Sequence, residues 1–185
     1  MRKDFGSKPW FYPMPVLVIG TYCEDGTPNA MTAAWGGLYE ADEIMLCLSE
    51  GHKTYANIRA RRAFTVSFAG AAQLVRADYL GLVSANSVPD KLERAGLRTE
   101  KSGFVDAPVL VDFPMALECE LVKFTEDGNV IGRIVNISVD ESALAGDGKP
   151  DVGAMAPISY DGVRNEYFVL GRKVGNAFHD GAALK

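Results

Sequence analysis

Apolar residues recur along the first part of the chain in short runs that predict β-strands. Residues 16–22 are rich in β-branched side chains, which is typical of a strand. Residues 24–27 contain the Asp-Gly pair of a hairpin turn, so residues 29–35 are expected to return antiparallel to the first strand. Residues 43–49 are largely apolar and residues 63–68 alternate cleanly, and each run predicts a further strand.

Three segments predict helices between and after these strands. Residues 52–62 and 74–82 each favour a helix of two to three turns. Residues 89–95 predict a shorter one, because Pro89 suits a first helical turn and Gly96 suits the end of a helix.

The second half of the chain predicts a long hairpin. Residues 115–124 and 130–139 alternate on either side of a turn that contains Asp127-Gly128. Residues 97–112 show no regular pattern, and residues 140–157 are polar and rich in Gly and Pro, which favours a surface excursion. Residues 167–170 predict a last short strand.

Six or seven antiparallel strands with inserted helices predict a mainly β protein. A closed or partly closed antiparallel barrel leaves the fewest unpaired strand edges, and the strand–helix alternation is too irregular for a doubly wound sheet. A length of 185 residues predicts a single domain over residues 1–185.

Composition narrows the classes of function. Hydrophobic residues make up 48% of the chain and charged residues 23%, as in globular proteins. A net charge of -5 argues against nucleic acid and anionic membranes as partners, and no apolar stretch approaches the roughly 20 residues of a membrane span. Cys23, Cys47 and Cys119 have no zinc spacing, so we expect no metal site and free thiols in a cytoplasmic protein.

Familiar catalytic motifs are missing. The chain has no H-E-x-x-H, no G-x-S-x-G, no P-loop and no G-x-G-x-x-G after a strand. These absences argue against three classes of enzyme: hydrolases, zinc enzymes and Rossmann dehydrogenases. Because no catalytic dyad is apparent, we expect no catalytic side chain, and any chemistry is expected to belong to a bound cofactor.

The start of the first predicted helix is a candidate phosphate site. Its first N–H groups lack intrahelical partners and carry partial positive charge, and Gly51 and Lys53 favour the approach of an anion. Ser49 and Thr54 add hydroxyl groups. The alternative is an ordinary capped helix with Lys53 in solvent.

The strand over residues 29–35 is a candidate site for a flat ring. Its small side chains leave the backbone edge accessible, with Ala30, Thr32 and Ala34 on one face and Met31, Ala33 and Trp35 on the other. The alternative is a packed barrel strand in which small residues fit a taper.

Several segments, in order along nearly the whole chain, resemble the signatures of the flavin reductase-like family and its flavoredoxin-type branch. They are residues 14–22, Asp25-Gly26, residues 28–37, residues 52–58, residues 78–84 with 88–91, and residues 170–178.

This resemblance implies a split β-barrel that binds FMN at a homodimer interface. It assigns the isoalloxazine ring and the ribityl phosphate to two groups of residues and adds two residues that close the pocket. The ring would lie along Asn29, Met31, Thr32, Ala33, Ala34 and Trp35, the phosphate against Ser49, His52, Lys53 and Thr54, and the closing residues would be Val83 and Ser84.

Three functions stay open at this point. The first is an NAD(P)H-dependent flavin reductase that passes hydride or electrons through flavin N5. The second is a flavoredoxin-type electron-transfer protein reduced by a redox protein, which the lack of a nicotinamide fingerprint allows. The third is a non-enzymatic ligand-binding barrel.

Overall fold

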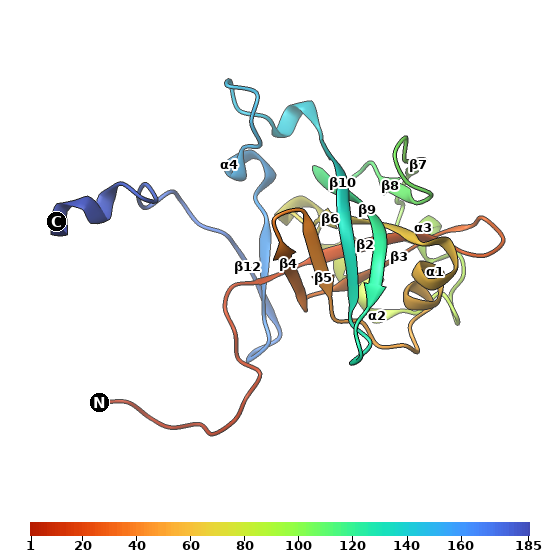
Figure 1. Ribbon diagram of the computed structural model, residues 1–185, viewed down its shortest axis with the longest axis horizontal. Helices are drawn as coiled ribbons and strands as arrows, with labels where there is room; N and C mark the ends of the chain where they lie inside the picture. Colours follow the sequence, from red (N-terminus) through yellow and green to blue (C-terminus); the bar gives the residue numbers. More distant parts are fainter.

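A seven-stranded antiparallel sheet forms the centre of the molecule in the computed structural model, which describes residues 1–185. Its strand order is β3-β2-β6-β9-β10-β5-β4 (Figure 1). The strands are β2 (Leu17–Tyr22), β3 (Pro28–Ala33), β4 (Gly36–Glu40), β5 (Glu43–Leu46), β6 (Ala63–Phe68), β9 (Met115–Phe124) and β10 (Val130–Val139).

The two edge strands of this sheet are consecutive in the chain, because only Ala34 and Trp35 separate β3 from β4. The sheet therefore curls. A Cβ added at Gly36 would lie 3.1 Å from Leu17 Cδ1 of β2 and 3.0 Å from Leu46 Cδ2 of β5. This contact brings the start of β4 back against β2, and the mainly antiparallel, partly closed barrel expected from the sequence is confirmed.

Alternating side chains of the sheet bury two cores. Leu17 and Ile19 of β2 belong to the core inside the barrel, which helix α1 (Lys53–Arg61) covers with Tyr55 and Ile58. Val16 and Val18, which point to the other face, pack in a second core with helix α2 (Leu74–Leu82) and helix α3 (Lys91–Arg94). The strand at residues 28–33 thus lies between α1 on one side and α2 on the other.

The predicted hairpin of β9 and β10 is present and runs from Val130 opposite Phe124 to Val139 opposite Met115. Two register shifts interrupt it, one between Ile131 and Gly132. A Cβ at Gly132 would lie 2.3 Å from Cζ of the fully buried Phe64. Strand β10 can pass the Phe64 ring at this point only because residue 132 is a glycine and has no side chain.

Five strands of the structure were not predicted from the sequence patterns. β4 was missed because the strand predicted over residues 29–35 ends at Ala33 and a new one starts at Gly36. Strands β7 (Thr99–Lys101) and β8 (Pro108–Leu110) pair within the segment predicted to be irregular. Strands β1 (Met14–Pro15) and β11 (Ile158–Asp161) pair across the length of the chain and form a small sheet with β12 (Glu166–Val169). These strands are too short for a periodic signal, so their partners define them.

Helix boundaries agree well with the sequence patterns, and α2 has the predicted ends. α3 is shorter than predicted, and Pro89 precedes its N-cap Asp90 instead of lying in the first turn. Gly96, with φ +61°, ends this helix as expected. The excursion over residues 140–157 contains a 3₁₀ helix at Glu141–Ala143 and one short α-helix, α4 (Val152–Met155).

Both ends of the chain extend away from the sheet in Figure 1. We call residues 171–185 the C-terminal arm; it includes a short 3₁₀ helix at Asp180–Leu184. No helix in the structure is long and apolar enough to span a lipid bilayer.

Candidate functional site

A cavity of about 190 Å³ lies between the start of α1 and the end of α2. We call it the helix-end cavity. It brings together eight of the twelve residues proposed from the sequence, namely Asn29, Met31, Thr32, His52, Lys53, Thr54, Val83 and Ser84. These residues come from β3, the start of α1 and the segment after α2, so tertiary folding assembles them.

The start of α1 has no side-chain cap. His52 is the N-cap residue, and its carbonyl accepts hydrogen bonds from the N–H groups of Tyr55 (3.1 Å) and Ala56 (3.3 Å). No acceptor is found for the N–H groups of Lys53 and Thr54. The ordinary capped helix considered from the sequence is therefore not present, and the uncapped end retains its attraction for an anion.

Lys91 completes this cavity and was not among the residues proposed from the sequence. Its side chain is only 2% exposed, and Nζ donates one hydrogen bond, of 3.0 Å, to the carbonyl of Val83. No carboxylate forms an ion pair with it. Burial lowers the pKa of the Lys91 ammonium to about 8. A buried cation is costly unless an anion compensates it, so the cavity favours an anionic occupant.

A buried polar network holds the cavity floor. The Asn29 amide donates to Oγ1 of Thr54 (2.9 Å) and, more weakly, to Oγ1 of Thr21 (3.3 Å). Asn57 of α1 also donates to Oγ1 of Thr21 (3.0 Å). Oδ1 of Asn29 has no partner. The network fixes the first turn of α1 against β2 and β3.

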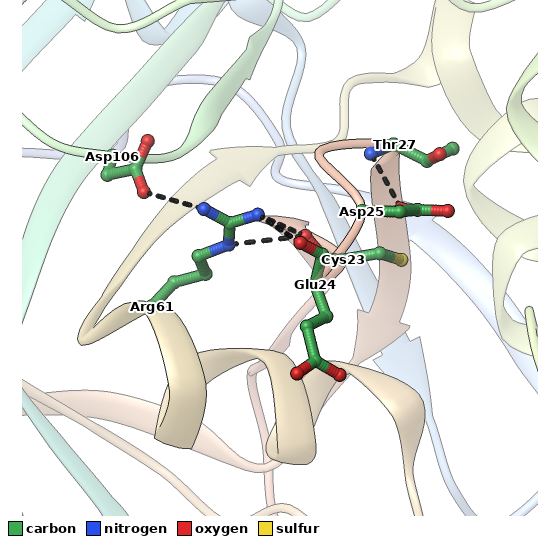
Figure 2. A network of polar contacts seen from close by, with 6 residues as sticks. All are labelled: Cys23, Glu24, Asp25, Thr27, Arg61 and Asp106. Atoms are coloured by element: carbon green, nitrogen blue, oxygen red, sulfur yellow. Dashed lines mark hydrogen bonds and ion pairs between the residues drawn. The ribbon is translucent and has the colours of Figure 1, made fainter.

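The other end of α1 is tied to the turn that precedes β3 (Figure 2). The Arg61 guanidinium donates to the carbonyl oxygens of Cys23 (2.6 Å) and Glu24 (2.9 Å) and also reaches Asp106 (3.4 Å). Within this turn Asp25 accepts the N–H of Thr27 (2.9 Å). Arg61 therefore sets the position of α1 relative to the strand that lines the cavity.

A second cavity, of about 440 Å³, adjoins the first along β3. We call it the strand-edge cavity. Ala33 and Ala34 line it, and it shares Thr32, Gly81 and Leu82 with the helix-end cavity. β3 is an edge strand, so no strand pairs with its outer side and its backbone is open to a ligand. The Thr32 hydroxyl is committed to the carbonyl of Ala77 (2.5 Å) and ties β3 to α2.

The far wall of the strand-edge cavity comes from the C-terminal part of the chain. Tyr160, Asn165 and Tyr167 line it, and the hydroxyl of Tyr167 donates to Asp78 (2.8 Å). Burial and the bond to Asp78 raise the pKa of Tyr167 to about 12, so the phenol stays protonated. No local pattern in the sequence could have joined β11 and β12 to a site near residue 33.

Two of the proposed residues lie outside both cavities. The side chain of Trp35 is 56% exposed, and its backbone carbonyl accepts the N–H of Cys47 (2.9 Å). Ser49 is exposed, and its carbonyl accepts the N–H of His52 (3.0 Å). No group of three metal-ligating side chains is found.

Fold and cavities together define an antiparallel barrel in which cationic groups converge beside an open strand edge. The chain belongs to the flavin reductase-like family, because the model of the flavin reductase like domain matches residues 10–158. The family inferred from the sequence motifs is thus confirmed.

Two solved structures support the flavoredoxin-type branch. A flavoredoxin of Desulfovibrio vulgaris (Miyazaki F) is 37% identical, with a TM-score of 0.95 over 98% of this chain and 100% of that one. A flavoredoxin from Methanosarcina acetivorans is 26% identical, with a TM-score of 0.91 over the whole of both chains. An FMN-binding domain from Shewanella baltica, at 18% identity and a TM-score of 0.75 over 88% of each chain, shares the fold.

Curated relatives are more distant. An uncharacterized protein of Archaeoglobus fulgidus is 26% identical over 77% of this chain and 81% of its own length. One of Aeropyrum pernix is 27% identical over 64% of this chain, and the match spans only 45% of that relative.

Proposed function

We propose that the protein binds FMN, with the phosphate in the helix-end cavity and the isoalloxazine ring along β3 in the strand-edge cavity. The main support for this proposal is the Lys91 ammonium, which is buried and has no anionic partner in the chain. A phosphate in the helix-end cavity would compensate its charge. The cavities share a wall, so one elongated ligand can occupy both.

The residues have distinct roles in this arrangement. Lys53 and Lys91 neutralise the phosphate, and the free N–H groups at the start of α1 donate to it. Asn29 holds Thr54 in place, while Met31, Ala33 and Ala34 leave the strand edge free for the ring. Val83 fixes Lys91 through its carbonyl and, with Ser84, borders the cavity.

We propose that the protein is an oxidoreductase that takes its electrons from NAD(P)H. Bound FMN would supply the redox chemistry: it would take up a hydride from NAD(P)H at N5 and pass the two electrons on to an acceptor, with the proton going to that acceptor or to solvent. The chain supplies binding, orientation and a cavity walled by Tyr167 and Tyr160. No side chain is needed as a general base.

A second candidate is an electron-transfer flavoprotein that a redox protein reduces. The likeness to two flavoredoxins over almost the entire chain favours it. In this case a nicotinamide nucleotide does not reduce the flavin directly.

Absorption spectroscopy separates these functions. Purified protein is expected to carry or to bind FMN and to show a flavin spectrum. Bleaching on anaerobic addition of NADH or NADPH supports the reductase, and bleaching only with a reduced redox protein supports electron transfer. Protein that stays colourless and does not bind FMN would overturn both and leave a barrel for another ligand.

We also propose a homodimer with the flavin near the interface. Trp35, Leu38 and Tyr39, which follow the ring-binding strand, expose large apolar surfaces that a second copy can cover.

A further inference from the structure

The C-terminal arm makes no hydrogen bond to the rest of its own chain. The last bond to the body joins the Leu170 N–H to the Pro157 carbonyl at 2.9 Å. Beyond it, the hydrogen bonds are internal to the arm, such as those from the Asn176 N–H to Asp180 (2.8 Å) and from the Asp180 N–H to the Asn176 carbonyl (3.2 Å). The arm thus has a defined turn but no support from the body.

Apolar side chains of the arm are left in solvent. Val174 and Leu184 are each 94% exposed, and Phe178 is fully exposed. Phe178 also has φ +60°, a backbone conformation that bulky residues rarely adopt unless their surroundings hold it. Nothing in its own chain does so. A short segment without packing cannot offset the entropy of ordering itself, so an ordered arm needs a further surface to pack against.

The body has a groove that is suited to such a segment. It measures about 490 Å³ and is lined by Met14, Met115, Met155, Phe68, Pro157 and Leu170 among others. Its one polar side chain, Ser159, already accepts the N–H of Met14 (3.1 Å). We call it the methionine groove. Methionine side chains adapt to the shape of an apolar partner, so the groove fits aromatic and aliphatic side chains.

We propose that the C-terminal arm of a second copy of this chain lies in the methionine groove, with Phe178 as its anchor, and that the two copies exchange arms. Each copy has one arm and one groove, and a two-fold axis satisfies both at once. The arm follows Leu170, which lines the groove, and leads away from its own body (Figure 1).

Charge and comparison favour a second copy as the occupant. The arm contains three basic residues, Arg172, Lys173 and Lys185, and one acidic residue, Asp180, whereas the whole chain carries a net charge of -5. A basic arm is therefore attracted to an acidic body. The flavoredoxin of Desulfovibrio vulgaris matches 98% of this chain at a TM-score of 0.95, which leaves too few unmatched residues to omit the arm.

Because the methionine groove lies beside the strand-edge cavity, an exchanged arm also affects the proposed flavin site. Gly36 and Gly37, which follow Trp35, line the groove, and Val16 borders both the groove and the strand-edge cavity. An arm in the groove therefore lies next to the strand edge and shields it from water.

Photocrosslinking tests the exchange directly. Isotope-labelled and unlabelled full-length chains, each with p-benzoylphenylalanine in place of Phe178, are mixed as equal parts, irradiated and analysed by mass spectrometry. The expected adducts join labelled to unlabelled chains and end on Met14, Met115 or Met155. Adducts within one chain, adducts outside the groove, or no adduct would overturn the proposal. The assay needs no cofactor, so its outcome is independent of whether FMN binds.

Dimer affinity gives a second test. Because Phe178 is exposed in a single chain, Phe178→Asp should leave folding intact and raise the dissociation constant of the dimer by about tenfold or more. Val75→Asp, which changes an 80% exposed residue on α2, is the matched control and should leave it unchanged. Equal dissociation constants for the two variants, measured by sedimentation, would contradict arm exchange.

Discussion

Lys91 places an ammonium group in a cavity where no carboxylate compensates its charge. Two opposite effects follow from one substitution. Lys91→Met should weaken FMN binding by about ten- to a hundredfold, since a hydrogen bond to a charged group contributes about 1.5–3 kcal/mol. The same change should stabilise the cofactor-free protein by about 1–2 kcal/mol, because it removes an unpaired buried charge.

Fluorescence titration with FMN and urea unfolding measure these two effects. Lys123→Met, at an exposed position of β9, is the control and should change neither. A Lys91→Met protein that binds FMN as tightly as the original would show that the phosphate does not contact Lys91.

The lowered pKa of Lys91 also predicts a pH dependence. Its pKa falls from 10.5 in the unfolded chain to about 8 in the folded one. Between these values the unfolded state binds more protons, so the stability of the cofactor-free protein should rise with pH from about 8 to about 10.5.

FMN affinity should change in the opposite direction. The phosphate is a dianion above about pH 6 and attracts only protonated Lys91, so affinity should fall by up to about tenfold per pH unit above pH 8. Titrations at increasing pH measure this slope, and Lys91→Met should flatten it. Equal slopes in the two proteins would rule out Lys91 as the titrating group.

Among the elements, the β9–β10 hairpin depends on one glycine. Gly132 lies at a register shift, and a Cβ there would lie 2.3 Å from the Phe64 ring, which has no room to move because it is fully buried. Gly132→Ala should therefore destabilise the fold by about 1–3 kcal/mol.

Denaturant unfolding compares Gly132→Ala with Gly103→Ala. A Cβ at Gly103 would have no atom within 4 Å, so this control should stay within about 0.5 kcal/mol of the original protein. If the two variants unfold alike, Phe64 does not restrict the hairpin.

For the whole molecule, the exposed apolar surface at β4 predicts self-association. Leu38 is 76% exposed on an edge strand. Leu38→Asp should weaken the proposed dimer by at least about tenfold, because it places a charge where apolar surface would be buried. Sedimentation measures the dissociation constant of the dimer, with Val75→Asp as the control. A stable monomer of the original protein loaded with FMN would contradict the dimer.

Local sequence determined most of the elements and the family. The hairpin of β9 and β10, helix α2 and the end of α3 at Gly96 follow from residue period, Asp-Gly turns and the conformational freedom of glycine, which act over a few residues. The small side chains of β3 and the start of α1 were likewise visible as two candidate ligand-binding segments, and the family resemblance joined them into one site.

Tertiary structure alone decided how those parts meet. Lys91 is an ordinary lysine in the sequence, and only the packing of α3 against β3 buries it beside Lys53. Tyr167 reaches the strand-edge cavity only because β12 joins β11, and β11 pairs with β1 at the other end of the chain. Burial and long-range pairing are properties of the folded chain, because they depend on residues far apart in sequence, and so no local pattern could reveal them.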